Sequence, residues 1–280
     1  GGMAANFWMS SHCQEWLRCK ADDAKTPLQQ EKTRRNRIIL TESEETKLRV
    51  HLAMFISNLG KHHQVRCRQR VIATATVYLA RFFYNNSYKD FHPHLIAATA
   101  VYLASKVEES PVQPNKIEKA LKELSRSAGK YGVNDIVDGE YFLMEELKFN
   151  LIVFHPYRPL QQYLADANLQ DVVSTAWYLI NDSYRLDVCL EYPPHIVAIA
   201  SILVAGTYAN QHAAVHAWFT ERLAFNDEHR LQVHQVTEQL LNMYEEYSHL
   251  EPEEIQELLN KIPNPPPVGS NMEPLPQHHH

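Results

Sequence analysis

The sequence predicts an all-α protein built from two copies of one small helical domain, and three observations carry that prediction. Apolar residues recur at helical spacing along almost the whole chain. Alternating strand patterns and the hairpin dipeptide Asn-Gly are absent. When the chain is shifted by 101 positions, residues 71–104 match residues 172–205 without a gap. A solenoid unit has about 20 to 50 residues, so a repeat this long indicates two domains.

The match between the two copies combines a few identities with many apolar-for-apolar pairs. The identical pairs are Val71/Val172, Thr74/Thr175, Ala75/Ala176, Pro93/Pro194, His94/His195, Ala97/Ala198 and Ala104/Ala205. Because both copies keep the same apolar positions, we expect them to share one arrangement of helices.

The first copy, residues 41–150, is predicted to hold five helices. Thr41 and Glu44 form a capping box at the start of the first helix, and Gly60 suits its C-terminal end. The other four helices are predicted at about 68–84, 93–107, from Pro114 onward, and about 134–147. The third of the five has no polar face, which is typical of a helix in the middle of a bundle.

The second copy, residues 151–262, repeats the pattern after a junction at residues 149–159. Its helices are predicted at about 156–167, 171–186, 193–209, 213–222 and 227–247, with a last short helix at 253–261. The proline-rich residues 263–280 cannot build a core, so they are predicted to form a flexible tail. Gly1 and Gly2 are interpreted as a cloning scar, and the terminal histidines as a possible tag.

Residues 1–40 are predicted to hold an N-terminal helix and a basic linker. Phe7, Trp8 and Trp16 give the helix an aromatic character, and the two tryptophans, eight residues apart, should share one helix face. A basic run follows the helix and is interpreted as a solvated linker, with a nuclear-import or phosphate-binding patch as the alternative. It consists of Lys25, Lys32, Arg34, Arg35 and Arg37.

Composition excludes several classes of function. The 280-residue chain carries a net charge of −6, which would repel the phosphate backbone of a nucleic acid. Its four cysteines are scattered without a zinc-binding spacing, at Cys13, Cys19, Cys67 and Cys189, and we expect no metal and no cofactor. The longest stretch without charged residues, 192–220, is interrupted by prolines, so no membrane span is expected.

Two charged residues occupy apolar helix faces. Glu140 breaks the apolar stripe of the fifth helix, and Lys106 ends the apolar third helix. The stripe consists of Ile136, Val137, Tyr141, Leu143, Met144 and Leu147. A carboxylate on an apolar face needs a partner, and the two residues have opposite signs, which predicts an ion pair between the helices. An ordinary structural salt bridge with no external role explains the spacing equally well.

The residues around Lys106 resemble a known family. Residues 95–109 read Leu-Ile-Ala-Ala-Thr-Ala-Val-Tyr-Leu-Ala-Ser-Lys-Val-Glu-Glu and are similar to the third helix of a cyclin box, which ends in Ala-Ser-Lys-x-Glu-Glu. The tandem five-helix repeat also resembles the cyclin architecture. Three further segments, 6–12, 151–160 and 181–194, are similar to the C-type branch of the family. The resemblance covers residues 6 to about 262.

This resemblance implies a non-catalytic subunit that binds and activates a cyclin-dependent kinase. The matching positions imply that Lys106 and Glu140 grip the kinase αC helix while an apolar pocket receives one of its side chains. The pocket would consist of Leu103, Val107, Met144, Phe149 and Leu151. The N-terminal segment with Phe7, Trp8 and Trp16 would dock on the kinase and help to select it.

The C-type branch further implies a partner in the Mediator kinase module, hence a nuclear protein that regulates transcription by RNA polymerase II. Other subunits of that module would be additional partners, without direct contacts to nucleic acid or to a membrane. Their contact is expected in a groove between the two copies, near Tyr157, Arg158, Trp177 and Asp182.

Two other classes of function stay open. Initiation factors of the TFIIB type also carry tandem cyclin folds and bind promoter DNA, but they should show a zinc ribbon and a basic face. An enzyme would have to use histidines such as His212 and His216, which share a helix face as in a zinc protease motif. Ala213 stands where that motif has its catalytic glutamate, and Glu246 with His249 gives a single Glu-x-x-His where a di-iron bundle needs two.

Overall fold

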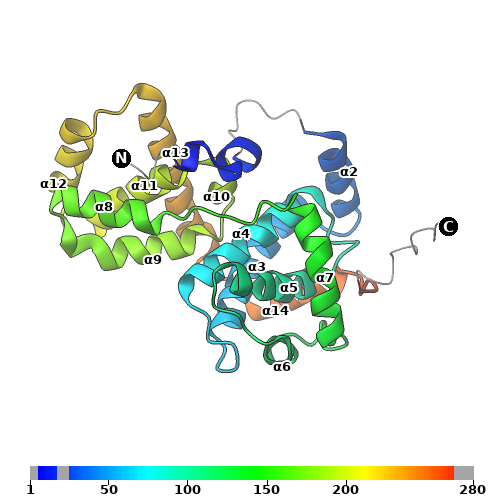
Figure 1. Ribbon diagram of the computed structural model, residues 1–280. Helices are drawn as coiled ribbons and strands as arrows, with labels where there is room; N and C mark the ends of the chain where they lie inside the picture. The colour runs from blue at the N-terminus through cyan, green and yellow to red at the C-terminus, as the bar shows by residue number, and fades with distance from the viewer. Residues whose placement is uncertain (1–5, 18–24, 268–280) are drawn as a thin grey trace, which may run out of the picture. The chain divides into compact units, whose positions relative to one another are not determined.

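The computed structural model describes residues 6–17 and 25–267, which form helices and connecting loops without a strand (Figure 1). The predictions on Gly1, Gly2, Cys19, the terminal histidines and the rest of the tail after residue 267 lie outside this part. The described residues divide into two compact units. We call residues 25–151 with 251–267 the first-copy unit, and residues 6–17 with 152–250 the second-copy unit.

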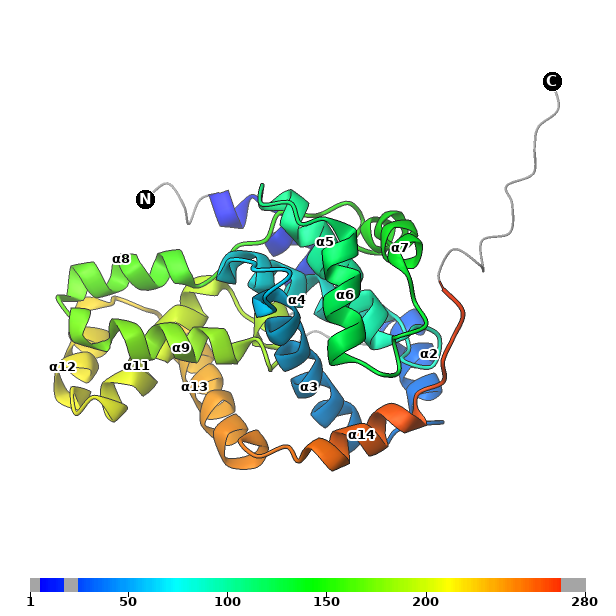
Figure 2. The ribbon, with the colours of Figure 1, turned by 90° about the horizontal axis from the view of Figure 1, so that it is seen from below.

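The first-copy unit packs its helices around one central helix, as the sequence predicts. These helices are α2 (Pro27–Asn36), α3 (Glu42–Lys61), α4 (Gln69–Asn85), α5 (Pro93–Val107), α6 (Pro114–Leu124), α7 (Val133–Glu146) and α14 (Pro252–Lys261). Helix α5 contacts α3, α4, α6 and α7 (Figures 1 and 2). Its alanines at 97, 98, 100 and 104 are fully buried, and such small side chains let neighbouring helices come close.

The second-copy unit repeats this plan around α11 (Pro194–Tyr208). Its other elements are η1 (His12–Trp16), α8 (Tyr157–Ala167), η3 (Gln170–Val172), α9 (Val173–Ser183), α10 (Val188–Glu191), α12 (His212–Ala217), η4 (Trp218–Arg222) and α13 (Asp227–Tyr247). Helix α11 contacts α8, α9, α12 and α13. The segment predicted as one helix at 171–186 is a short 3-10 turn followed by α9, and α10 was not predicted.

The predicted basic linker is a helix in the structure. Helix α2 begins with a capping box between Thr26 and Gln29, which the sequence analysis missed. Arg35 pairs with Asp90, and Arg37 Nη1 lies 2.6 Å from a Glu45 oxygen. The prediction of a solvated linker was wrong here, because Lys32, Arg35 and Arg37 pair with carboxylates of the first copy. Arg34 pairs with Glu31 within α2 and stays exposed.

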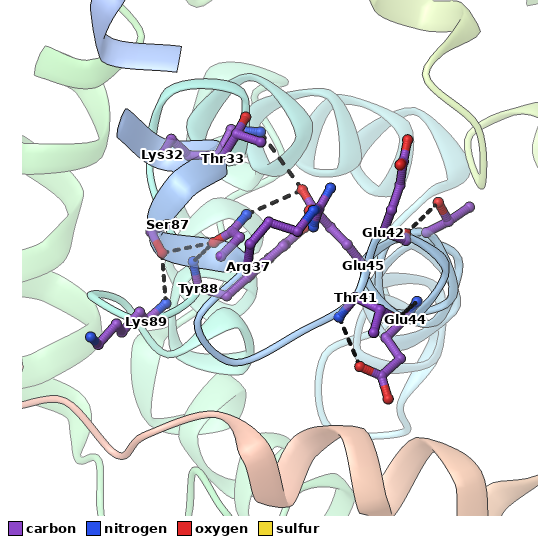
Figure 3. Close-up of polar contacts among 12 residues, drawn as sticks. Lys32, Thr33, Arg37, Thr41, Glu42, Glu44, Glu45, Ser87, Tyr88 and Lys89 are labelled. Carbon is purple, nitrogen blue, oxygen red and sulfur yellow. Dashed lines mark hydrogen bonds and ion pairs between the residues drawn. The ribbon is translucent and has the colours of Figure 1, made fainter. Parts of the chain in front are cut away.

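Asn36 anchors the end of α2 in a buried polar network, and its partners Glu45, Ser87 and Tyr88 are labelled in Figure 3. Its side chain is fully buried, and its amide nitrogen donates to Glu45 Oε1 at 3.1 Å. Its carbonyl oxygen accepts from the Ser87 hydroxyl at 2.7 Å and from the Tyr88 main-chain N–H at 3.1 Å. A buried amide with all these partners fixes α2 on α3 and on the loop after α4.

The last helix packs on the first copy, although the sequence analysis assigned it to the second. Helix α14 contacts α3 (Figure 2), where Lys47 pairs with Glu254 and Lys261 Nζ lies 2.5 Å from Glu44. The Tyr131 hydroxyl donates to the Pro265 carbonyl at 2.7 Å, so residues 263–267 also lie against this unit. The boundary predicted at residue 262 therefore falls at residue 250.

The N-terminal segment folds onto the second copy. Phe7 and Trp16 are 4% and 3% exposed, and the Phe7 ring lies 5.7 Å from Phe154. The Phe154 main-chain N–H donates to His12 Nδ1 at 3.0 Å. The expected common face of Trp8 and Trp16 was wrong: the helix breaks after Trp8, which stays 44% exposed, and resumes as a π-helix at His12.

Three histidines lie together inside the first-copy unit. His51 Nε2 and His94 Nε2 are 3.1 Å apart, and His94 Nδ1 lies 2.6 Å from the Ser125 hydroxyl. The main-chain N–H of His94 donates to His92 Nδ1. Burial lowers the pKa of His51 to about 4. Burial, and then the charge of Lys130, lowers the pKa of His92 to about 4, and burial holds the pKa of His94 well below its ordinary value.

None of the described helices combines the length and the apolar character that a membrane span requires.

The buried histidines predict a loss of stability in weak acid. The folded chain keeps them neutral, whereas the unfolded chain binds protons as pH falls below 6.5, the ordinary histidine pKa. Stability should therefore be complete above pH 7 and fall toward pH 4. The loss at pH 5 is about 2 kcal/mol per histidine. Thermal unfolding of the full chain between pH 7.5 and 4.5 measures it.

His51→Gln should reduce this pH dependence, because glutamine keeps a hydrogen-bonding group and does not titrate. His63→Gln changes an exposed histidine of the same unit and should keep the full pH dependence of the parent chain. If stability fell equally steeply with pH in the parent chain and in His51→Gln, His51 would not be a source of the pH dependence.

The anchoring of α2 predicts that Asn36→Ala destabilises the first-copy unit. The substitution leaves the buried Ser87 hydroxyl and the Tyr88 N–H without their acceptor, which costs about 1 to 3 kcal/mol. Denaturant unfolding monitored by circular dichroism measures the change. Gln30→Ala, at an exposed position of the same helix, is the control and should shift the midpoint little. Similar midpoints for both variants would argue against the anchor.

Candidate functional site

The predicted ion pair between Lys106 and Glu140 is present in the structure. Lys106 lies in the last turn of α5, and Glu140 lies in the middle of α7. The two helices approach closely because Gly139 faces Thr99, whose hydroxyl oxygen would lie only 3.2 Å from an added Cβ. A larger side chain at 139 would push the helices apart, so this glycine helps to bring the two charges together.

The pair lies at the surface and is accessible from outside. The Lys106 side chain is 40% exposed and that of Glu140 is 13% exposed. The Lys106 ammonium also lies 4.4 Å from the centre of the Tyr102 ring, which adds a cation–π contact. Partial burial pulls the Lys106 pKa down, but the bond to Glu140 and the charge of that residue outweigh it, so the pKa is raised.

The residues predicted to form an apolar pocket differ in how deeply they are buried. Leu103 is 2% exposed and lies in the interior, while Val107, Met144 and Leu151 are partly buried. Phe149 is 55% exposed. Thus Leu103 belongs to the core beneath the surface, and Phe149 is the member that a partner can reach most easily.

Backbone conformation turns the chain at Phe149. Lys148 and Phe149 both have positive φ, 53° and 57°, a region that residues other than glycine rarely adopt. The Phe149 N–H donates to the Met144 carbonyl at 2.8 Å, which closes the end of α7. Two strained residues in succession are retained only where the surroundings hold them, which often marks a functional surface.

One aromatic residue of this surface, Tyr141, was not predicted from the sequence to be exposed. Tyr141 was placed in the apolar stripe of α7, together with Val137, but the two are 58% and 36% exposed. The Tyr141 ring lies 6.1 Å from that of Phe149, edge to face. Helical spacing alone could not separate them from buried Ile136, because a wide apolar stripe is expected in any core helix. We call Lys106, Glu140, Tyr141, Met144 and Phe149 the α5–α7 surface.

The structure brings only two of the four predicted groove residues into contact, and all four belong to the second-copy unit. The Tyr157 ring lies 4.5 Å from that of Trp177. Asp182 instead pairs with Arg185 and accepts a hydrogen bond from the Tyr244 hydroxyl at 2.6 Å. Within the described residues, Arg158 makes no polar contact with the others, and its side chain is exposed.

The histidines considered for an enzyme do not assemble a metal site in the described part of the chain. His212 and His216 lie with ring centres 5.8 Å apart on α12, without a third ligand. The one group of three possible ligands among the described residues is His62, His63 and Glu123.

Comparisons with known proteins agree with this architecture. The cyclin N-terminal domain matches residues 24–152. Cyclin-C of Drosophila melanogaster is 40% identical over 279 residues, covering 95% of this chain and 98% of its own length. Cyclin-C1-1 of Oryza sativa subsp. japonica is 37% identical over 270 residues, covering 94% of this chain and 99% of its own length.

Solved structures show the same fold at lower identity. A chain of the CAK complex of Chaetomium thermophilum bound to ATP-gamma-S is 17% identical with a TM-score of 0.70, covering 95% of this chain and 91% of its own. A chain of the yeast TFIIK complex is 21% identical with a TM-score of 0.64, covering 83% of this chain and 99% of its own.

Fold and sequence together therefore define a regulatory subunit rather than an enzyme. The chain belongs to the cyclin family. Its full-length similarity is to proteins named cyclin-C, as the segments 6–12, 151–160 and 181–194 predicted.

Proposed function

We propose that this chain binds and activates the cyclin-dependent kinase of the Mediator kinase module and thereby regulates transcription by RNA polymerase II in the nucleus. The observation that carries the proposal is the exposed α5–α7 surface of a cyclin fold, where an accessible ion pair lies beside exposed aromatic rings. The likeness to cyclin-C relatives over nearly the whole chain supports the choice of kinase.

The chemistry of this surface suits a helix of the kinase. Lys106 can donate to main-chain carbonyls at the end of a helix, and Glu140 can accept from main-chain N–H groups. Met144 and Phe149 offer apolar contact beside the charges, with Val107 and Leu151 at the margin and Leu103 beneath. An apolar side chain of the kinase αC helix would bury these exposed rings.

Activation then follows from differential binding. A protein kinase is active when the glutamate of its αC helix pairs with the lysine that holds the ATP phosphates. A partner that binds only the inward position of αC shifts the equilibrium toward that position by its difference in affinity. The cyclin chain contributes no catalytic group to the reaction.

The N-terminal segment is proposed to contribute a second contact to the kinase. Buried Phe7 and Trp16 hold this segment on the second-copy unit, so they would act by positioning it. Trp8 and Met9, which are 44% and 77% exposed, would make the contact. Exposed aromatic side chains are frequent anchors of protein interfaces.

Further subunits of the Mediator kinase module are proposed to bind the second-copy unit near Tyr157, Arg158, Trp177 and Asp182. The adjoining rings of Tyr157 and Trp177, which are tilted by 37°, offer apolar contacts, and the hydroxyl and carboxylate groups around Asp182 offer polar contacts. Arg158→Ala that left all subunit contacts unchanged would argue against a role for this residue.

The ion pair predicts a measurable loss of kinase affinity. Lys106→Ala or Glu140→Ala leaves the partner charge unpaired in the interface, which costs about 2 to 5 kcal/mol of binding. Titration of the cyclin-dependent kinase of the Mediator module by calorimetry measures it. Lys122→Ala is a matched control, because Lys122 pairs with Glu118 on α6 of the same unit. Unchanged affinity for both site variants would refute the proposed contact.

The exposed aromatic rings predict a second loss of kinase affinity. Tyr141→Ser with Phe149→Ser should weaken kinase binding about tenfold or more, because the apolar area buried in the complex is lost. Both side chains are more than half exposed, so the midpoint of thermal unfolding should change little. Tyr178→Ser is the control, because Tyr178 is a 68% exposed tyrosine of α9 outside the α5–α7 surface. This variant should keep full kinase affinity. Full affinity of the double variant would exclude these rings from the interface.

A further inference from the structure

The second-copy unit contains a pocket of about 330 Å³, and of its lining residues only Trp8 and its support Phe7 have a role above, in the proposed kinase contact. Helices α8 and α11, the loop before α13 and the N-terminal segment form its walls. Its lining is largely aromatic and includes Trp8, Phe154, Tyr163, His195, Phe225 and His229, with Asp166 as its carboxylate. A concave site of this size with a single charged group is typical of a specific binding pocket.

The rings follow one another around the pocket. The Trp8 ring centre lies 6.0 Å from that of His195, and the two planes are inclined by 66°. The Phe225 ring centre lies 6.4 Å from that of His195 and 5.5 Å from that of His229. Phe7 supports Trp8 from the core side, at 5.2 Å between ring centres. Several aromatic faces around one space form a site that attracts a cation.

The charges point to the same kind of ligand. Within the described part of the chain, no cation pairs with the Asp166 carboxylate, and the residue is exposed. The nearby Arg222 donates weakly, at 3.4 Å, to the main-chain oxygen of Asp166. The Asp166 charge also raises the Tyr163 pKa, after the larger effect of burial, so this carboxylate lies beside the aromatic wall.

The whole unit is acidic, in contrast to the first copy. Residues 6–17 and 152–250 contain 12 Asp and Glu side chains against 4 arginines and no lysine. Residues 25–151 and 251–267 contain 21 Lys and Arg against 18 Asp and Glu. An acidic surface attracts positively charged segments and accelerates their association.

We propose that this pocket binds an arginine side chain from a basic peptide segment of a protein partner. The planar guanidinium group would stack on Trp8 and Phe225, and its N–H donors would reach the Asp166 carboxylate. Arginine suits the site better than lysine, because its flat, delocalised charge stacks on aromatic faces and pairs with a carboxylate through two parallel hydrogen bonds.

The buried His195 of the pocket does not oppose a cation. Burial, and then the neighbouring His229, lowers the pKa of His195 to about 4, so this ring is neutral at physiological pH. Its ring can therefore contribute to the aromatic wall.

The test uses the free full-length chain and does not depend on kinase binding. The probe is the acetylated and amidated peptide Gly-Gly-Arg-Gly-Gly, titrated while the indole N–H resonances are followed by NMR. Loss of one resonance in Trp8→Phe assigns the Trp8 signal. The arginine peptide should shift this signal in a saturable way. A peptide with citrulline in place of arginine should bind about tenfold more weakly, because the citrulline side chain is similar in size but carries no charge.

A pair of matched variants separates the pocket from general attraction to an acidic unit. Asp166→Asn should weaken binding of the arginine peptide about fivefold or more, because the charge-assisted pair between the guanidinium group and the carboxylate is lost. Asp171→Asn removes the same charge from an exposed position in η3 and should leave the affinity unchanged. Equal binding of the citrulline peptide, an unshifted Trp8 signal, or equal effects of the two variants would each overturn the proposal.

Discussion

The close packing of α5 against α7 is the constraint on which the proposed kinase-binding surface depends. Small side chains along α5 and Gly139 on α7 let the two backbones approach, with Thr99 at the point of contact. This approach brings Lys106 and Glu140 within ion-pairing distance at the surface, where Lys106 ends an apolar helix and Glu140 interrupts an apolar stripe of α7. The pair is accessible rather than sealed, so it can exchange its internal partner for main-chain groups of another protein.

Much of the fold was predictable because helical periodicity and the internal repeat are strong signals. The 101-residue shift placed α4 and α5 on α9 and α11, and Pro93 and Pro194 each lie in the first turn of a central helix. The capping box at Thr41 marked the start of α3. The ion pair itself could be inferred, because two opposite charges on apolar faces of one bundle need partners.

Other features could not be predicted because they depend on tertiary contacts. The basic run before α3 has little apolar character, yet Asn36, Arg35 and Arg37 find buried or ionic partners in the first copy. Helix α14 packs on α3, where it pairs with Glu44 and Lys47, and spacing does not reveal these contacts. Tyr141 looked like a core residue because periodicity does not show which side of a wide apolar stripe stays uncovered.

The most direct test of the central claim is hydrogen–deuterium exchange of the chain alone and mixed with the cyclin-dependent kinase of the Mediator module. A helix of the kinase seated on the α5–α7 surface would exclude water from the end of α5 and from α7. We therefore expect slower exchange in residues 100–110 and 137–150, with α6 of the same unit unaffected. A stable complex in which these two segments exchange as fast as in the free chain would contradict the account.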